Sequence, residues 1–87
     1  MKGVTLRQLR IFAAVAKHLS FIRAAEELHL TPPAVSMQIR ELEAQVGLPL
    51  FDRSSRSATL TTVGEYLLAH TQRVLAALRD AEDMVAR

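Results

Sequence analysis

Short side chains and one cation share a face of the segment 31–47. At 100° per residue, the residues on this face are Pro33, Ser36, Met37, Arg40 and Ala44. Ser36 can hydrogen-bond to a base edge or a phosphate, Met37 can touch a thymine methyl group, and Arg40 can meet phosphate or guanine. Because this face carries no anion and little bulk, it suits the major groove of DNA, which is about 12 Å wide. The pattern indicates double-stranded DNA as a partner.

A second group of cations lies in the Ser-rich segment 53–57. Arg53 and Arg56 stand there among three serines. Cations at such a position fit a narrow, electronegative minor groove or its rim. Arg56 has no acid beside it in the sequence, so DNA contact is the favoured hypothesis for this residue.

Arg40 and Arg53 each have a structural alternative to DNA contact. Arg40 can be a solvated charge bonded to Glu41 or Glu43. Arg53 can pair with Asp52 or brace a hairpin. The sequence leaves these alternatives open.

Catalytic and metal-binding chemistry finds no support in the residue pattern. His18, His29 and His70 lack the spacing of a metal site, and Glu26 with His29 is a lone Glu-x-x-His without further ligands. Ser36 has no Lys three residues on and no recognisable His/Asp array. The chain also has no Cys and no Gly-rich phosphate loop. We therefore expect no enzymatic activity, no cofactor and no bound metal.

Charge is distributed unevenly along a chain that is long enough for one domain. Among 87 residues, positions 1–40 hold six cations and two anions, whereas positions 61–87 hold three cations and four anions. This division suggests a polyanion partner for the first part and a protein partner for the last. The longest apolar run has six residues, far short of the roughly 20 of a membrane helix, and Cys is absent. We expect a cytoplasmic protein that makes no membrane contact.

Apolar periodicity and capping residues predict three helices before residue 48. The first covers residues 5–18, with a Thr5/Gln8 capping box and a stripe of Leu6, Leu9, Phe12, Ala13 and Ala16. The second covers 21–28 after the N-cap Ser20. The third follows Thr31 and two prolines, turns a positive dipole end outward and stops at Gly47. Its buried stripe is Val35, Ile39, Leu42 and Val46.

A small hairpin and one long helix complete the predicted order. Segments 48–52 and 58–60 read as short strands around the basic tip. Thr62 and Glu65 have capping-box spacing, and a helix is expected from there to residue 87. Its alternating seam, typical of a helix that pairs with another helix, consists of Leu67, Thr71, Val74, Leu78, Ala81 and Val85.

These elements predict a mainly α fold, a winged helix-turn-helix of three short helices and a two-stranded wing. We expect residues 1–60 to form this DNA-binding domain and residues 61–87 to form a linker helix for dimerisation. The rival hypothesis is a helical interaction module in which the long helix is the whole function. The basic hairpin after an acid-free helix face favours DNA binding, because a coiled-coil adaptor needs neither.

The motifs of this sequence closely resemble the amino-terminal domain of LysR-type transcriptional regulators. They are FIRAAEELHL at 21–30, TPPAVSMQIRELEAQVGLPLFDR at 31–53 and LTTVG at 60–64. The resemblance spans nearly the whole chain, and residues 34–38 are similar to regulators of carbon-dioxide-fixation operons. It implies a bacterial regulator whose effector domain lies outside this chain, so that any small-molecule effector acts through that domain.

The resemblance also implies the mode of binding. A homodimer, paired antiparallel through the long helix, would place two recognition helices on a partly palindromic operator, and the full-length protein can form tetramers. The implied DNA contacts are Ser20, Phe21, Thr31, Pro32, Pro33, Ser36 and Met37, with wing contacts at Arg53 and Arg56.

Two positions depart from the pattern of the family. Many members carry Gln where this chain has Pro32, which cannot make a bidentate contact to adenine. Thr is common where this chain has Ile22, so a hydrogen bond to phosphate is lost there. Both departures affect base preference and leave the predicted fold unchanged.

Overall fold

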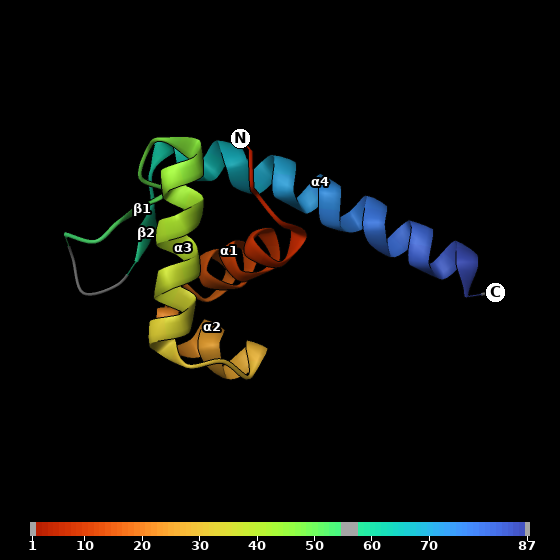
Figure 1. The fold of residues 1–87 in the computed structure, drawn as a ribbon, viewed down its shortest axis with the longest axis horizontal. Coiled ribbons are helices and arrows are strands. Elements are labelled where there is room, and N and C mark those ends of the chain that lie inside the picture. Colours follow the sequence, from red (N-terminus) through yellow and green to blue (C-terminus); the bar gives the residue numbers. More distant parts are fainter. Residues whose placement is uncertain (1, 55–57, 87) are drawn as a thin grey trace.

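The computed structural model describes residues 2–54 and 58–86 of the chain. Its elements are α1 (Leu6–His18), α2 (Phe21–Leu28), α3 (Pro32–Val46), β1 (Phe51–Asp52), β2 (Thr59–Leu60) and α4 (Thr62–Val85). The helices α1, α2 and α3 form a body, the wing of β1 and β2 stands beside α3, and α4 extends away from the body (Figure 1). The predicted winged helix-turn-helix with a long final helix is confirmed, although its two antiparallel strands are shorter than expected.

Each of the four helices begins at a hydroxyl side chain that accepts a backbone N–H. The cap of α1 is a complete capping box, in which Thr5 and Gln8 exchange hydrogen bonds of 3.0 and 3.2 Å. The helices α1, α2 and α3 end at residues in the left-handed conformation. His29 is one of these residues, and it makes the connection between α2 and α3 tight.

The start of α4 differs from the prediction by one residue. The N-cap is Thr61, whose Oγ1 accepts a hydrogen bond from the Gly64 amide at 3.0 Å, and not Thr62. The Thr61 hydroxyl also donates to the Pro49 carbonyl at 2.8 Å. Thr61 is therefore the residue that ties the start of α4 to the loop before β1.

Gly64 permits the closest approach in the fold between α4 and the wing. A Cβ atom at this position would collide with the carbonyl oxygen of Leu50 and lie 2.9 Å from Cδ2 of Leu60. The requirement is steric, because Gly64 has ordinary helical backbone angles. Only a residue without a side chain lets α4 pack here.

The core lies between α3, α1 and the wing. On α3, Val35, Ile39 and Leu42 are fully buried, which confirms the predicted inner face, while Val46 is half-buried. Phe51 of β1 packs edge-on against Phe12 of α1, with ring centroids 5.5 Å apart. The wing is thus anchored in the same core as the recognition helix.

The buried face of α1 is rotated from the predicted stripe. Leu6 is largely exposed, whereas Gln8, Ile11 and Val15 are buried. Gln8 is tolerated inside because its side-chain oxygen accepts the Thr5 amide and its Nε2 donates to Gln38 Oε1 at 3.3 Å. The capping role of Gln8 therefore decides which side of α1 faces the core.

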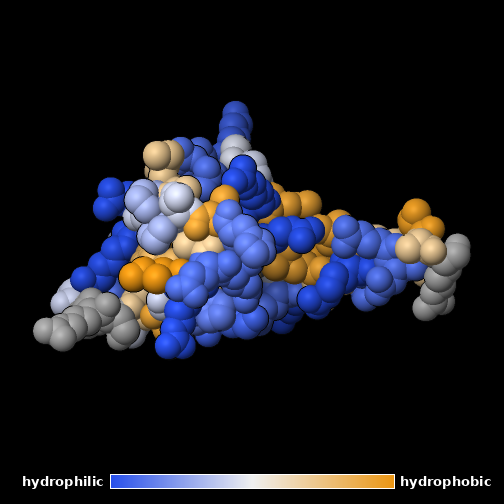
Figure 2. All heavy atoms as spheres, turned by 90° about the horizontal axis from the view of Figure 1, so that it is seen from below, coloured by the Kyte–Doolittle hydropathy of each residue, from blue (hydrophilic) through white to orange (hydrophobic). Residues whose placement is uncertain are grey.

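Apolar side chains also reach the surface of the molecule. Figure 2 shows hydrophobic atoms gathered where α4 leaves the body and again at its far end. Met84 and Val85 form that end, with Val85 84% exposed. No helix within residues 2–54 and 58–86 combines the length and hydropathy that crossing a membrane requires.

We expect Ile39→Ala to lower the free energy of unfolding by about 2–5 kcal/mol, because the substitution leaves a cavity beneath α3. Urea denaturation followed by circular dichroism measures this change. Met37→Ala on the exposed face of the same helix is the matched control and should change stability by less than about 0.5 kcal/mol. Equal losses for the two variants would contradict the facing of α3.

Candidate nucleic-acid interface

The outward face of α3 matches the predicted set of residues. Pro33, Met37, Arg40 and Ala44 are exposed and Ser36 is half-buried, opposite the buried stripe. Met37 is 58% exposed although it is apolar. The structure therefore brings together on one open surface the groups that could read a base edge, a methyl group and a phosphate.

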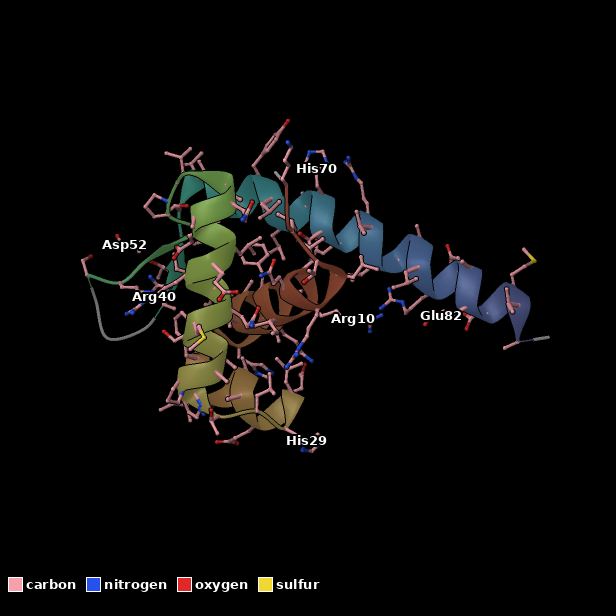
Figure 3. All side chains as sticks on the ribbon, in the orientation of Figure 1. Arg10, His29, Arg40, Asp52, His70 and Glu82 are labelled. Carbon is pink, nitrogen blue, oxygen red and sulfur yellow. The ribbon has the colours of Figure 1, made fainter. Side chains whose placement is uncertain are left out.

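Arg40 is available on this surface. Within the described part of the chain, no carboxylate forms an ion pair with its guanidinium. The alternative in which Glu41 or Glu43 binds Arg40 is thus not seen. The Arg40 side chain lies on the side of α3 that faces the wing (Figure 3).

The amino ends of α2 and α3 carry the remaining predicted contacts of the body. Thr31 caps α3 by accepting the Ala34 amide at 3.3 Å, and Pro32 and Pro33 follow it, both exposed. Ser20 caps α2 by accepting the Arg23 amide at 3.1 Å. Both caps leave the side-chain oxygens at the surface, beside a helix end of positive potential.

Arg53 is held by two partners within the chain. Its Nη1 lies 3.2 Å from Glu43 Oε1, and its guanidinium carbon lies 5.3 Å from the ring centroid of Phe21. The predicted alternative of a bond to Asp52 is wrong, whereas the brace of the hairpin is confirmed. Asp52 instead accepts the Ser54 amide at 2.9 Å.

The charge at the base of the wing is set by Asp52. Hydrogen bonds from the side chain and the backbone amide of Ser54 hold the pKa of Asp52 below its usual value. Asp52 is therefore an anion at neutral pH and turns the chain at the end of β1. Arg56, the other predicted wing contact, lies outside the described residues, as do its neighbours at 55 and 57.

Glu43 and Ile22 belong to this surface although the pattern gave them smaller parts. Glu43 had been considered only as a neighbour of Arg40, yet its side chain is 12% exposed and binds the wing. A long-range partner of this kind leaves no trace in helical spacing. Ile22 is 62% exposed in the first turn of α2, where it adds an apolar group to the surface.

The histidines take part in capping and surface pairing. Glu27 accepts from Lys17 Nζ and His18 Nε2, both at 2.9 Å, and the hydrogen bonds from Lys17 and then His18 lower the pKa of Glu27. These groups are exposed and join the end of α1 to α2. Within residues 2–54 and 58–86, no three His, Cys, Asp or Glu side chains form a group that could hold a metal ion.

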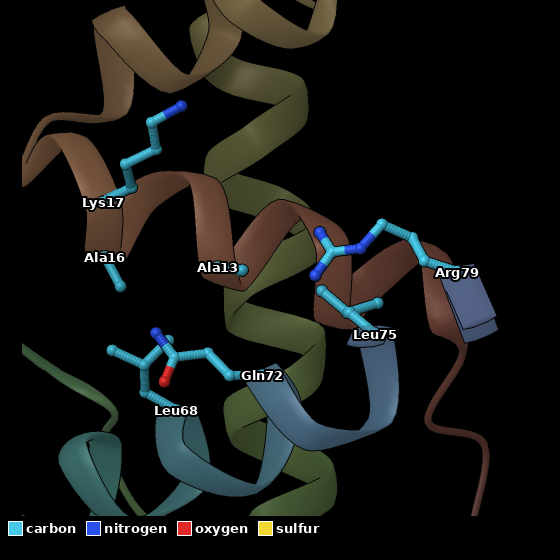
Figure 4. Close-up of a pocket in the computed structure, with 7 residues that line it drawn as sticks. All are labelled: Ala13, Ala16, Lys17, Leu68, Gln72, Leu75 and Arg79. Carbon is cyan, nitrogen blue, oxygen red and sulfur yellow. The ribbon is translucent and has the colours of Figure 1, made fainter. Parts of the chain in front are cut away.

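A groove of about 380 Å³ separates α1 from α4. Figure 4 shows the residues that line it, which are Ala13, Ala16, Lys17, Leu68, Gln72, Leu75 and Arg79. Two cations flank an otherwise apolar floor, and none of these lining residues can act as a general base or a nucleophile beside an acid. The groove therefore offers packing surface, and the candidate interface on α3 is elsewhere.

The predicted pairing seam of α4 divides into two parts. Leu67 is partly buried against the core and Thr71 is 1% exposed, so both face their own domain. Val74, Ala81 and Val85 are exposed and Leu78 is half-buried, farther along the helix. His70 projects from the side of α4 away from α1 (Figure 3). The outer half of α4 is the part open to a partner.

The comparison with protein families agrees with this geometry. The family described as "Bacterial regulatory helix-turn-helix protein, lysR family" matches residues 6–65, from the start of α1 into α4. The chain belongs to the LysR family. Its members named below are transcriptional regulators and not enzymes.

Curated LysR-family relatives are regulators of carbon-fixation genes by name. The chain is 55% identical over 83 residues to the HTH-type transcriptional regulator CfxR of Cupriavidus necator, which covers 95% of this chain and 26% of the relative. It is 56% identical over 77 residues to CbbR of Rhodospirillum rubrum, covering 88% of this chain and 26% of that protein. A RuBisCO operon transcriptional regulator of Allochromatium vinosum is 49% identical over 82 residues. The chain thus spans about a quarter of the length of these relatives.

Solved LysR-family domains share the fold over the whole described chain. The BenM DNA-binding domain in complex with benA site 1 DNA superposes with a TM-score of 0.92 at 33% identity, covering 97% of this chain and 94% of that one. The CbnR DNA-binding domain in complex with DNA gives a TM-score of 0.87 at 34% identity, covering 97% and 100%. Both similar structures contain a duplex.

We expect Thr71→Val to raise the free energy of unfolding of this LysR-family chain by about 1 kcal/mol. Thr71 Oγ1 is buried without a hydrogen-bond partner, and Val removes that hydroxyl while keeping nearly the same shape. Thermal unfolding measures the change, and Thr62→Val at an exposed position is the control. Because Thr71 faces its own domain, sedimentation of the variant should match that of the unsubstituted chain. A loss of stability would show that the hydroxyl has a partner.

Proposed function

We propose that this chain binds a partly palindromic operator as a homodimer, with α3 in the major groove and the wing at the adjacent minor groove. The observation that carries the proposal is the sidedness of α3. Its inner stripe is fully buried, while the anion-free outer face is open to solvent. The DNA complexes of the similar BenM and CbnR domains support this assignment.

Each residue of the outer face has a proposed part in DNA binding. Ser36 and Met37 contact base edges, and Arg40 contacts phosphate or guanine. The flanking contacts to the backbone and neighbouring bases come from Ser20, Phe21, Thr31, Pro32 and Pro33, with Arg53 and Arg56 in the wing. Pro32 contributes shape and apolar surface, because its side chain has no hydrogen-bonding group.

The proposed dimer pairs the outer halves of two α4 helices. Val74, Leu78, Ala81 and Val85 supply an apolar stripe that a second copy can cover. Residues 1–60 and 61–87 are the proposed DNA-binding and linker parts. Full-length protein would carry an effector domain and can assemble further to tetramers.

The curated relatives suggest which genes are controlled. Three of them are named for RuBisCO operons or are regulators closely similar to these, at 49–56% identity. We infer that the whole protein regulates a carbon-dioxide-fixation operon in the bacterial cytoplasm. Selection of bound duplexes from a random pool tests operator symmetry and base preference together. A helical adaptor would retain no duplex even at low salt.

We expect Arg40→Ala to weaken binding to the selected duplex and to reduce the slope of log affinity against log salt by about 0.9, if one phosphate contact is lost. Fluorescence anisotropy across a salt series measures both quantities. Arg73→Ala on α4 removes the same charge away from the proposed interface and is the control. Unchanged slope and affinity for Arg40→Ala would remove this residue from the DNA contacts.

We expect Val74→Glu combined with Leu78→Glu to dissociate the dimer, because four like charges would meet in the seam. Sedimentation equilibrium measures the oligomeric state. Ala69→Glu combined with Gln72→Glu adds the same charge on another side of α4 and should leave the dimer intact. The reverse result would place the pairing surface on the groove side of α4.

A further inference from the structure

A single carboxylate joins the recognition helix to the wing. Glu43 lies near the end of α3, and its Oε2 accepts hydrogen bonds from the amides of Leu50 at 2.7 Å and Phe51 at 3.4 Å. Its Oε1 lies 3.2 Å from Arg53 Nη1. One side chain therefore binds three donors in the segment that forms β1.

The two amides explain why an acceptor is needed at this position. Leu50 is fully buried and Phe51 is 3% exposed, so their N–H groups have little access to water. A buried N–H without an acceptor is costly, and a carboxylate is a strong acceptor. A carboxylate that is itself mostly removed from water is unfavourable without a cation, and Arg53 supplies one.

Arg53 extends the connection to α2. Its guanidinium lies over the face of Phe21, the first residue of α2. The Phe21 ring packs edge-on against Phe51 at 5.8 Å. The three elements proposed to face DNA, namely α2, α3 and the wing, therefore meet around this one arginine.

We propose that Glu43 and Arg53 form a latch that sets the position of the wing relative to α3. In this role Arg53 is a positioning residue, which promotes DNA binding by holding the wing and not by contacting a phosphate. Since its charge is already paired with Glu43, it adds little to the release of counterions. This inference rests on the proposed DNA-binding function, because it concerns how that surface is assembled.

The test is a double-mutant cycle on the full chain, with the duplex selected by the unsubstituted chain as probe. Glu43→Gln keeps an acceptor for the Leu50 amide, and Arg53→Gln removes the cation. Each substitution should weaken binding about tenfold, and the double variant should lose no more than either one, because both break the same contact. Glu41→Gln, at an exposed acid of the same helix, is the charge-matched control and should not weaken binding.

The salt series separates a latch from a phosphate contact. If Arg53 positions the wing, Arg53→Gln should leave the slope of log affinity against log salt unchanged, and Arg53→Lys should bind as weakly as Arg53→Gln because Lys cannot reproduce the planar guanidinium contacts. A slope reduced by about 0.9, or binding rescued by Lys, would overturn the latch and make Arg53 a phosphate contact. Multiplicative losses in the cycle would also overturn it. Failure of the unsubstituted chain to bind any duplex would instead overturn the proposed function.

Thermal unfolding of all four proteins keeps the result clear of a folding defect. The variants should remain folded at the temperature of the binding assay, since the aromatic core around Phe51 is untouched. If the variants lose binding only in proportion to their unfolded fraction, the latch is excluded as a determinant of DNA affinity.

Discussion

The burial of one stripe of α3 is the constraint on which the rest of the structure depends. Val35, Ile39 and Leu42 are removed from water against α1 and the wing, and burial of three such side chains stabilises the fold by about 5–9 kcal/mol on transfer scales. A helix anchored along one side cannot rotate without exposing that stripe. The opposite side, with Met37 and Arg40, is therefore held toward solvent in a fixed orientation.

The wing is fastened to this helix by polar and steric contacts more than by its own pairing. Two strands of two residues each are too short to be stable alone. Phe51 enters the core, Glu43 binds the segment that leads into β1, and Gly64 lets α4 press against the Leu50 carbonyl. The hairpin thus belongs to the body, and its position follows that of α3.

Local patterns predicted most of this fold, and contacts between distant residues account for what they missed. Periodicity and caps are local, so the helices, their ends and the outer face of α3 were predictable. Thr61 and Thr62 are equivalent as caps until the Pro49 carbonyl selects Thr61. The alternation that includes Thr71 cannot tell a helix's own core from a partner's surface. Glu43 meets its partners only after the chain has turned at Gly47.

The two prolines after Thr31 have a consequence for how α3 meets an anion. Pro32 and Pro33 have no amide hydrogen, and the Ala34 amide is already bound by the Thr31 hydroxyl. The three residues after the cap therefore retain no spare N–H, although the helix end keeps its positive potential. A phosphate near this end would be attracted without being held in one direction. Tight registration on the duplex is left to side chains, and the first turn itself permits lateral movement along the backbone.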